Sequence, residues 1–132
     1  MDHRLLAEAN RLPKDLADRI EAARDRIAAH LPEHPPASLL HGDLWTGNVH
    51  FDMQGAAWLV DPASYHGHAE VDLAMLTLFG QPPPAFWDEY GAPGDGWQVR
   101  QAIYQLWPAL VHLRLFGAGY RPLVERCLSR VP

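Results

Sequence analysis

A turn-forming tetrapeptide in the middle of the chain constrains the fold more than any other feature. Residues 52–55 (DMQG) lie between residues 48–51, in which apolar and polar side chains alternate, and the apolar residues 56–60 (AAWLV). Two such runs joined by a Gly-containing turn are typical of a β-hairpin. We therefore predict a hairpin at about residues 48–61, with Asp61 where the second strand ends.

Helical periodicity flanks the predicted hairpin on both sides. Apolar residues recur at spacings of three and four from Leu16 to Leu31, and the prolines of residues 31–36 (LPEHPP) then end the pattern. Three more helical patterns follow: residues 69–80, a long one including residues 103–113 that we expect to bend at Pro108, and residues 120–128. The pattern predicts a mainly α-helical fold with one short β-hairpin (α+β), in a single domain over residues 1–132.

Composition narrows the function classes. With 132 residues, 48% of them hydrophobic, the chain can bury a sizeable core. A net charge of -5 without a block of Lys and Arg argues against nucleic acid or an anionic membrane as partner, although ATP could still bind through a metal ion. Cys127 is the only cysteine, and no apolar signal core or membrane-spanning run is present, so we expect a cytoplasmic protein without disulfides.

Three oxygen-bearing side chains surround the predicted hairpin. Asp43 and Asn48 precede its first strand and Asp61 follows its second, so pairing of the strands would open all three toward one end. Asn48 and Asp61 would offer oxygen ligands to a hard cation such as Mg²⁺, which uses one or two protein oxygens together with substrate phosphates. Asp43 would then remain to orient or deprotonate a hydroxyl group.

Other polar and aromatic residues have simpler interpretations. Glu70 and Asp72 stand where a helix starts, which favours capping over contact with a substrate. His66 and His68 lack a cysteine partner and an H-E-x-x-H pattern, which argues against zinc. Several residues are expected in the core or, for the tryptophans, in an interface: Trp45, Trp58, Trp97, Trp107 and Cys127.

The central motif also resembles a known catalytic loop. HGDLWTGN at residues 41–48 is similar to the loop of the aminoglycoside phosphotransferase and protein-kinase-like superfamily, in which protein kinases carry H-R-D-x-x-x-x-N. Asp61 resembles the magnesium-binding Asp of the kinase D-F-G motif. Within the superfamily, the sequence resembles the fructosamine kinase (ketosamine kinase) family over residues 35–120, through HGDLWTGN, DPASYHGHAEVDLAMLTLFG and YQLWPALVHLRLFGAGY in that order.

This resemblance implies a protein-kinase-like C-terminal lobe that transfers the γ-phosphate of ATP to a sugar hydroxyl of a ketosamine, either free or protein-bound, with ATP and Mg²⁺ as cofactors. It implies that Asp43 orients the hydroxyl, and that Asn48 and Asp61 bind Mg²⁺. It assigns supporting roles to four residues of the loop: His41 as a brace, Gly42 and Gly47 in tight turns, and Trp45 in lining a sugar pocket.

The chain also departs from the superfamily pattern. Kinases of this type need an N-terminal lobe with a phosphate-covering loop and a strand Lys, and the sequence before Pro35 holds neither. Lys14, the only lysine, lies in a helical pattern. We therefore expect the N-terminal lobe to be absent from this chain. The expected partner is either that missing N-terminal lobe or another chain. An exposed apolar patch where that lobe should dock would favour a fragment or a complex.

Two other functions stay open at this point. The chain could be a non-catalytic remnant or binding module that keeps the lobe's fold, or a magnesium-dependent phosphohydrolase in which Asp43 activates water.

Overall fold

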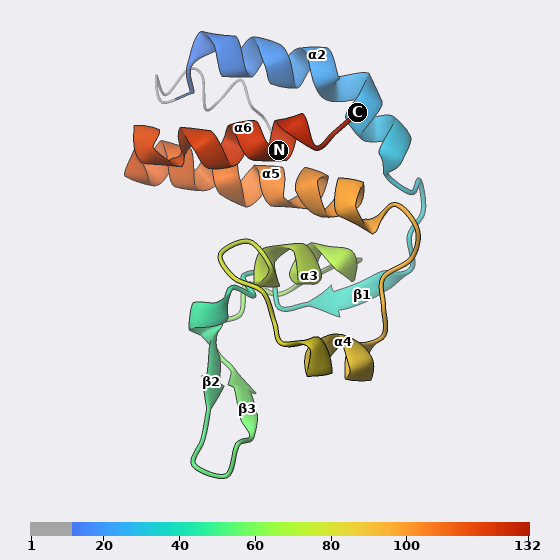
Figure 1. Cartoon of the computed structure of the whole chain (residues 1–132), viewed down its shortest axis with the longest axis vertical. Helices are drawn as coiled ribbons and strands as arrows, with labels where there is room; N and C mark the ends of the chain where they lie inside the picture. The colour runs from blue at the N-terminus through green and yellow to red at the C-terminus, as the bar shows by residue number, and fades with distance from the viewer. Residues whose placement is uncertain (1–11) are drawn as a thin grey trace. The chain divides into compact units, whose positions relative to one another are not determined.

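The computed structural model describes residues 12–132, and the chain divides into two compact units (Figure 1). Within the described residues, the first unit combines residues 12–32 with Gln98–Pro132, and the second consists of Glu33–Trp97. The prediction of one domain over residues 1–132 stays a prediction. No helix among residues 12–132 is both long and apolar enough to cross a membrane.

The first unit is helical. It contains α2 (Lys14–His30), α5 (Trp97–Phe116, apart from its first residue), the 3-10 turn η2 (Ala118–Tyr120) and α6 (Arg121–Ser129). Helical spacing puts Leu16, Ile20 and Ala23 of α2 on one buried face. The core of this unit consists of Leu12, Leu16, Ile20, Leu106, Ala109, Leu110, Leu113, Val124, Cys127 and Leu128.

The predicted helices of this unit are confirmed, with ends that differ by a few residues. α2 ends just before the proline-rich segment, and α6 begins one residue after its predicted start. α5 continues as one helix through Pro108. Cys127 is 3% exposed, which confirms that it is a buried small hydrophobe; burial raises the pKa of its thiol.

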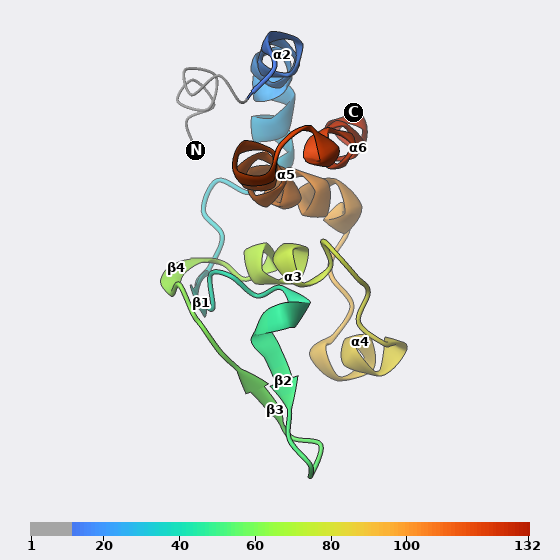
Figure 2. The same ribbon diagram turned by 90° about the vertical axis from the view of Figure 1, so that its left-hand side faces the viewer.

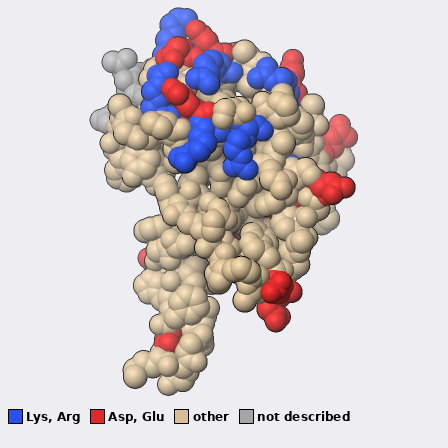
Figure 3. Space-filling view, in the orientation of Figure 1, with Lys and Arg blue, Asp and Glu red and all other residues tan. Residues whose placement is uncertain are grey.

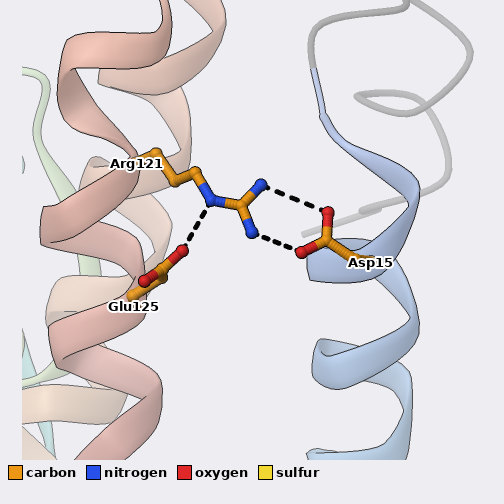
Figure 4. Close-up of polar contacts among 3 residues, drawn as sticks. All are labelled: Asp15, Arg121 and Glu125. Atoms are coloured by element: carbon orange, nitrogen blue, oxygen red, sulfur yellow. Dashed lines mark hydrogen bonds and ion pairs between the residues drawn. The ribbon is translucent and has the colours of Figure 1, made fainter.

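An ion-pair triad joins α6 to α2 (Figure 4). The guanidinium of Arg121 donates hydrogen bonds to both carboxylate oxygens of Asp15, and its Nε donates to Glu125 at 2.5 Å. This two-pronged contact holds the pKa of Asp15 below its ordinary value and raises the pKa of Arg121. Because Asp15 lies 106 residues from Arg121, the triad fastens the two helices to each other.

The second unit contains two small antiparallel sheets (Figures 1 and 2). β2 (Val49–Phe51) pairs with β3 (Ala57–Leu59), which confirms the predicted hairpin. β1 (Ala37–Leu40) pairs with β4 (Tyr65–His68), a sheet that the sequence analysis did not predict. The fold is therefore mixed, with helices and two small antiparallel sheets, of which the sequence predicted only the hairpin.

Three short helical segments complete this unit: η1 (Thr46–Asn48), α3 (Glu70–Leu76) and α4 (Pro84–Tyr90). The sequence predicted no helix over the residues of α4, which follow two prolines. Pro84 is instead the first residue of α4, a position where proline loses no helical hydrogen bond.

Of the four tryptophans predicted to lie in the core or in an interface, only Trp97 lies in the core. Trp97 is 9% exposed and therefore buried, but Trp45, Trp58 and Trp107 are between 42% and 61% exposed. The core placement was wrong for these three side chains.

Candidate active site

The backbone of the HGDLWTGN loop is held from α3. The carboxylate of Asp72 accepts hydrogen bonds from the backbone N–H of His41 at 2.7 Å and of Gly42 at 3.1 Å. Asp72 therefore bonds the loop from the first turn of α3. Two charge-assisted bonds to successive amides fix the direction of the loop just before Asp43.

His41 braces the loop against the end of the hairpin. Its Nδ1 accepts a hydrogen bond from the backbone N–H of Asp43 at 3.2 Å, so Nδ1 must be the unprotonated nitrogen. Its Nε2 lies 2.7 Å from the carbonyl oxygen of Val60 and donates its proton there. One imidazole thus links Asp43 to Val60, the last residue before Asp61.

Two further bonds bring residues 60–63 alongside the loop. The N–H of Val60 donates to the carbonyl of Asn48 at 3.0 Å, and the N–H of Ala63 donates to the carbonyl of His41 at 2.8 Å. Asp61 follows Val60 directly, so the structure brings the segment carrying Asp61 to the segment carrying Asp43 and Asn48.

Asp61 has an unusual backbone conformation. Its φ is 52°, the only positive φ of a non-glycine residue in the described part of the chain. Left-handed backbone costs a non-glycine residue about 1–2 kcal/mol and is concentrated at functional sites. The residue as a whole is exposed to solvent.

The two glycines of the loop serve different purposes. Gly42 has φ of 90°, and a Cβ there would lie 2.0 Å from the carbonyl oxygen of Ala63, so only glycine fits. Gly47 does not have a positive φ; a Cβ there would lie 2.1 Å from the indole of Trp45. Gly42 therefore allows the tight turn, whereas Gly47 makes room for a ring.

Asp43 and Asn48 are joined directly. Asn48, 6% exposed, donates from Nδ2 to the backbone carbonyl of Asp43 at 2.8 Å and to its carboxylate at 3.4 Å. The carbonyl can only accept, so the amide nitrogen must face Asp43. The amide oxygen of Asn48 is thereby left as the atom that can coordinate a cation.

The oxygen donors suit magnesium. The amide oxygen of Asn48 and the carboxylate of Asp61 are hard ligands, and two protein ligands are what Mg²⁺ uses when phosphates and water fill its remaining positions. Among residues 12–132, no group of three or more His, Cys, Asp or Glu side chains is arranged to hold a metal ion. His66 and His68 are strand residues of β4.

The charge of the second unit supports a cation site. Residues 33–97 contain nine Asp or Glu residues and no Lys or Arg. In Figure 3 the Lys and Arg side chains gather on one part of the molecule; all of them belong to the first unit. The net charge of -5, taken over the whole chain, conceals this segregation. Within residues 33–97, a phosphate could be neutralised only by a bound metal or by histidine.

The hairpin that begins after Asn48 is exposed and apolar. Its exposed large side chains are Phe51 (72%), Met53 (100%), Trp58 (61%) and Leu59 (57%). Asp52 orders the tip by accepting hydrogen bonds from two backbone amides of the turn and from the indole of Trp58, which lowers the pKa of Asp52. The structure therefore contains an exposed apolar patch next to the candidate site.

Tyr65 is a neighbour of the site that the sequence analysis missed. Partial burial, and secondly the charge of Asp72, raise its pKa above the ordinary value of 10.0, so the phenol stays a hydrogen-bond donor at neutral pH. The only signal was its place after DPAS, since β4 was not predicted.

Comparisons with known proteins show the family of this chain. The family model for fructosamine kinase matches residues 2–131. A probable ketoamine kinase of Enterococcus faecium is 41% identical over 95% of this chain and 47% of its own length. One of Thermus thermophilus is 42% identical over 86% of this chain and 43% of its own length. The chain thus spans about half the length of these curated relatives.

Solved structures give the same result. A crystal structure of a candidate fructosamine-3-kinase from Thermobifida fusca matches with a TM-score of 0.82 and 34% identity, over 97% of this chain and 46% of that one. Another from Haemophilus somnus matches with a TM-score of 0.68 and 29% identity, over 81% of this chain and 38% of that one. The fold of this chain is therefore similar to part of these two solved structures. The chain belongs to the fructosamine kinase family.

Proposed function

We propose that this chain carries the catalytic loop and the metal ligands of an ATP-dependent kinase that phosphorylates a sugar hydroxyl of a ketosamine. Its fold would correspond to the C-terminal lobe of the protein-kinase-like superfamily. The single observation that carries the proposal is the hydrogen bonding within the catalytic-loop motif and between it and the residues after the hairpin. Asn48 donates hydrogen bonds to Asp43, and the backbone hydrogen bond from Val60 to Asn48 brings the backbone of Asp61 close to both.

Asp43 is proposed to position the attacking hydroxyl. The amide of Asn48 fixes one of its carboxylate oxygens, which leaves the other to accept the hydroxyl proton. Transfer forms the bond from the sugar oxygen to the γ-phosphorus, breaks the bond from that phosphorus to the ADP oxygen, and passes the proton to Asp43. The exposed indole of Trp45, held over Gly47, would line the sugar pocket.

Asn48 and Asp61 are proposed to bind Mg²⁺, which would neutralise charge on the ATP phosphates when bound. Because residues 33–97 contain no Lys or Arg, any cationic side chain that grips the phosphates must come from elsewhere. The exposed apolar hairpin beside the site is where we place the polypeptide that supplies it.

The test is ATP-dependent phosphorylation of fructosyl-lysine. The chain is assayed alone and fused behind the N-terminal half of a family member, each as wild type and Asp43→Asn. We expect little turnover from the chain alone and clear turnover from the fusion. Asp43→Asn should lower kcat of the fusion about a hundredfold or more with little change in ATP affinity, because it removes the positioning group and leaves the metal ligands.

Two outcomes would contradict the proposal. Full activity of the Asp43→Asn fusion would remove Asp43 from the catalytic role. A fusion that folds and binds ATP, but hydrolyses it without phosphorylating the ketosamine, would favour a phosphohydrolase.

A further inference from the structure

The first turn of α3 holds the catalytic loop without a side-chain cap of its own. Ala69, the residue before α3, has helical backbone angles and offers no side chain that could cap the helix. Asp72 is the third residue of the helix, a position from which a side chain can reach back to cap the first turn. Its two carboxylate oxygens instead accept hydrogen bonds from the amides of His41 and Gly42, outside the helix. The position of Asp72 therefore depends on other contacts of the first turn.

A histidine–glutamate pair spans the junction between β4 and α3 (Figure 2). His68 is the last residue of β4, Glu70 is the first residue of α3, and Ala69 alone separates them. Nε2 of His68 lies 3.7 Å from Oε2 of Glu70, and the two side chains are 19% and 13% exposed. A carboxylate with so little access to water gains more from a neighbouring cation than an exposed carboxylate does. Protonated His68 is thus an ion-pair partner for Glu70.

The composition of the unit favours this use of a histidine. Residues 33–97 contain no Lys or Arg, so histidine is the side chain of this unit that can carry a positive charge. The other titratable side chains at the junction are Tyr65 and His66 on β4 and Asp72 on α3, and β1 has none. His66 is exposed, whereas His68 is partly buried and lies within ion-pair distance of Glu70.

Glu70 and Asp72 hold α3 from two sides. Side chains two positions apart project about 200° apart around a helix axis. Glu70 therefore contacts the end of β4 while Asp72 contacts the loop, and the two contacts together oppose rotation of the first turn about its axis. Loss of the ion pair would permit this rotation and move the carboxylate of Asp72 away from the amides that it bonds.

β4 also supports the strand that leads into the loop. β1 pairs with β4 over its whole length and is followed directly by His41. The chain on both sides of the β4–α3 junction is thus connected to the catalytic loop, through β1 on one side and through Asp72 on the other. A side chain that fixes this junction can therefore act on the loop without touching it.

We propose that His68 is a positioning residue of the candidate active site. Its protonated ring holds Glu70, and through the first turn of α3 it sets the position of the Asp72 carboxylate that fixes the catalytic loop. The inference deepens the proposed function and rests on it for any effect on catalysis. The effect on the loop itself is measured without phosphoryl transfer.

The direct readout is amide hydrogen exchange of His41 and Gly42, followed by NMR in the 132-residue chain at about pH 6, where histidine carries charge. His68→Gln should speed exchange of both amides about tenfold, because it removes the ion pair. His68→Lys, which keeps a positive charge, should stay within about twofold of wild type. The amide of Thr77, at the far end of α3, should keep its rate in both variants. Its rate separates a movement of the first turn from loss of the whole helix.

Matched variants test the route from His68 to the loop. His66→Gln replaces an exposed histidine on the same face of β4 and should leave both amides within about twofold of wild type. Glu70→Gln should speed exchange as His68→Gln does, and the double variant should add less than about twofold to either one. In the fusion with the N-terminal half of a family member, His68→Gln should lower kcat about fivefold, whereas His68→Lys should keep it. Circular dichroism verifies that each variant is folded.

Several results would overturn the inference. Unchanged exchange of His41 and Gly42 in His68→Gln would do so whether or not the fusion is active. Equal rates in His68→Gln and His68→Lys would mean that the charge of the side chain has no role, and additive effects of His68→Gln and Glu70→Gln would exclude the route through Glu70. If His68→Gln does not fold, Glu70→Gln decides by the same two amides. Faster exchange in His68→Gln, together with a wild-type fusion that phosphorylates nothing, would support the positioning of the loop and overturn the proposed function alone.

Discussion

At the scale of single residues, Gly42 allows the close approach of residues 41–48 to residues 60–63. Gly42→Ala should destabilise the protein by about 2–4 kcal/mol, because the new Cβ would meet the carbonyl of Ala63 in addition to straining a backbone with φ of 90°. Gly55→Ala is the matched control, since Gly55 has φ of 81° but no atom within 4 Å of a new Cβ, and should cost only about 1 kcal/mol. Urea denaturation measures both, and equal costs would mean that the contact with Ala63 is relieved by a small shift.

Asp61 permits a clean test of the metal site. Asparagine tolerates left-handed backbone as aspartate does, so Asp61→Asn should keep the conformation and remove only the charge. We expect Mn²⁺ affinity to fall about tenfold. Asp88→Asn, which removes an exposed carboxylate from the same unit, should leave it unchanged. Manganese titration by electron paramagnetic resonance checks this, and identical affinities in wild type and Asp61→Asn would exclude Asp61 as a ligand.

At the scale of elements, the triad between α2 and α6 makes stability depend on pH. Arg121 lowers the pKa of Asp15 in the folded protein, so this contribution is complete above the ordinary aspartate value of 3.8 and disappears as pH falls through the lower, folded value. Arg121→Met should therefore reduce stability at neutral pH and flatten its decline in acid. Lys14→Met is the control, because its ion pair with Asp18 is exposed and within one helix. Thermal melts at several pH values measure the effect, and parallel curves for wild type and Arg121→Met would contradict it.

Elements specified by local signals could be predicted, and elements specified by distant partners could not. The hairpin follows from the turn at residues 52–55, which Asp52 organises through its own neighbours. β4 has the sequence YHGH, which lacks strand-like alternation, and it forms because β1, far away in the chain, pairs with it. The candidate site followed the same rule: Asp43, Asn48 and Asp61 came from a motif, whereas Tyr65 depends on β4.

At the scale of the whole molecule, the single cysteine reports on the helical unit. Cys127 lies in the core of α2, α5 and α6, and burial raises its pKa. Since the thiolate is the reactive form, the native thiol should react with an aromatic disulfide reagent about a hundredfold more slowly than in urea. The rate against urea concentration should follow the loss of helical circular dichroism. A native thiol that reacts as fast as the denatured one would place Cys127 on the surface.

The division of the helical unit into two chain segments affects the order of folding. Residues 33–97 stand between α2 and its partners α5 and α6, so during synthesis α2 emerges before the two helices whose core it shares through Leu16 and Ile20. Closing this long loop carries an entropic cost that is smaller once residues 33–97 have become compact. The unit that carries the candidate site should therefore fold before the helices that precede and follow it. Its assembly then acts as the nucleus that brings the two ends of the helical unit within reach of each other.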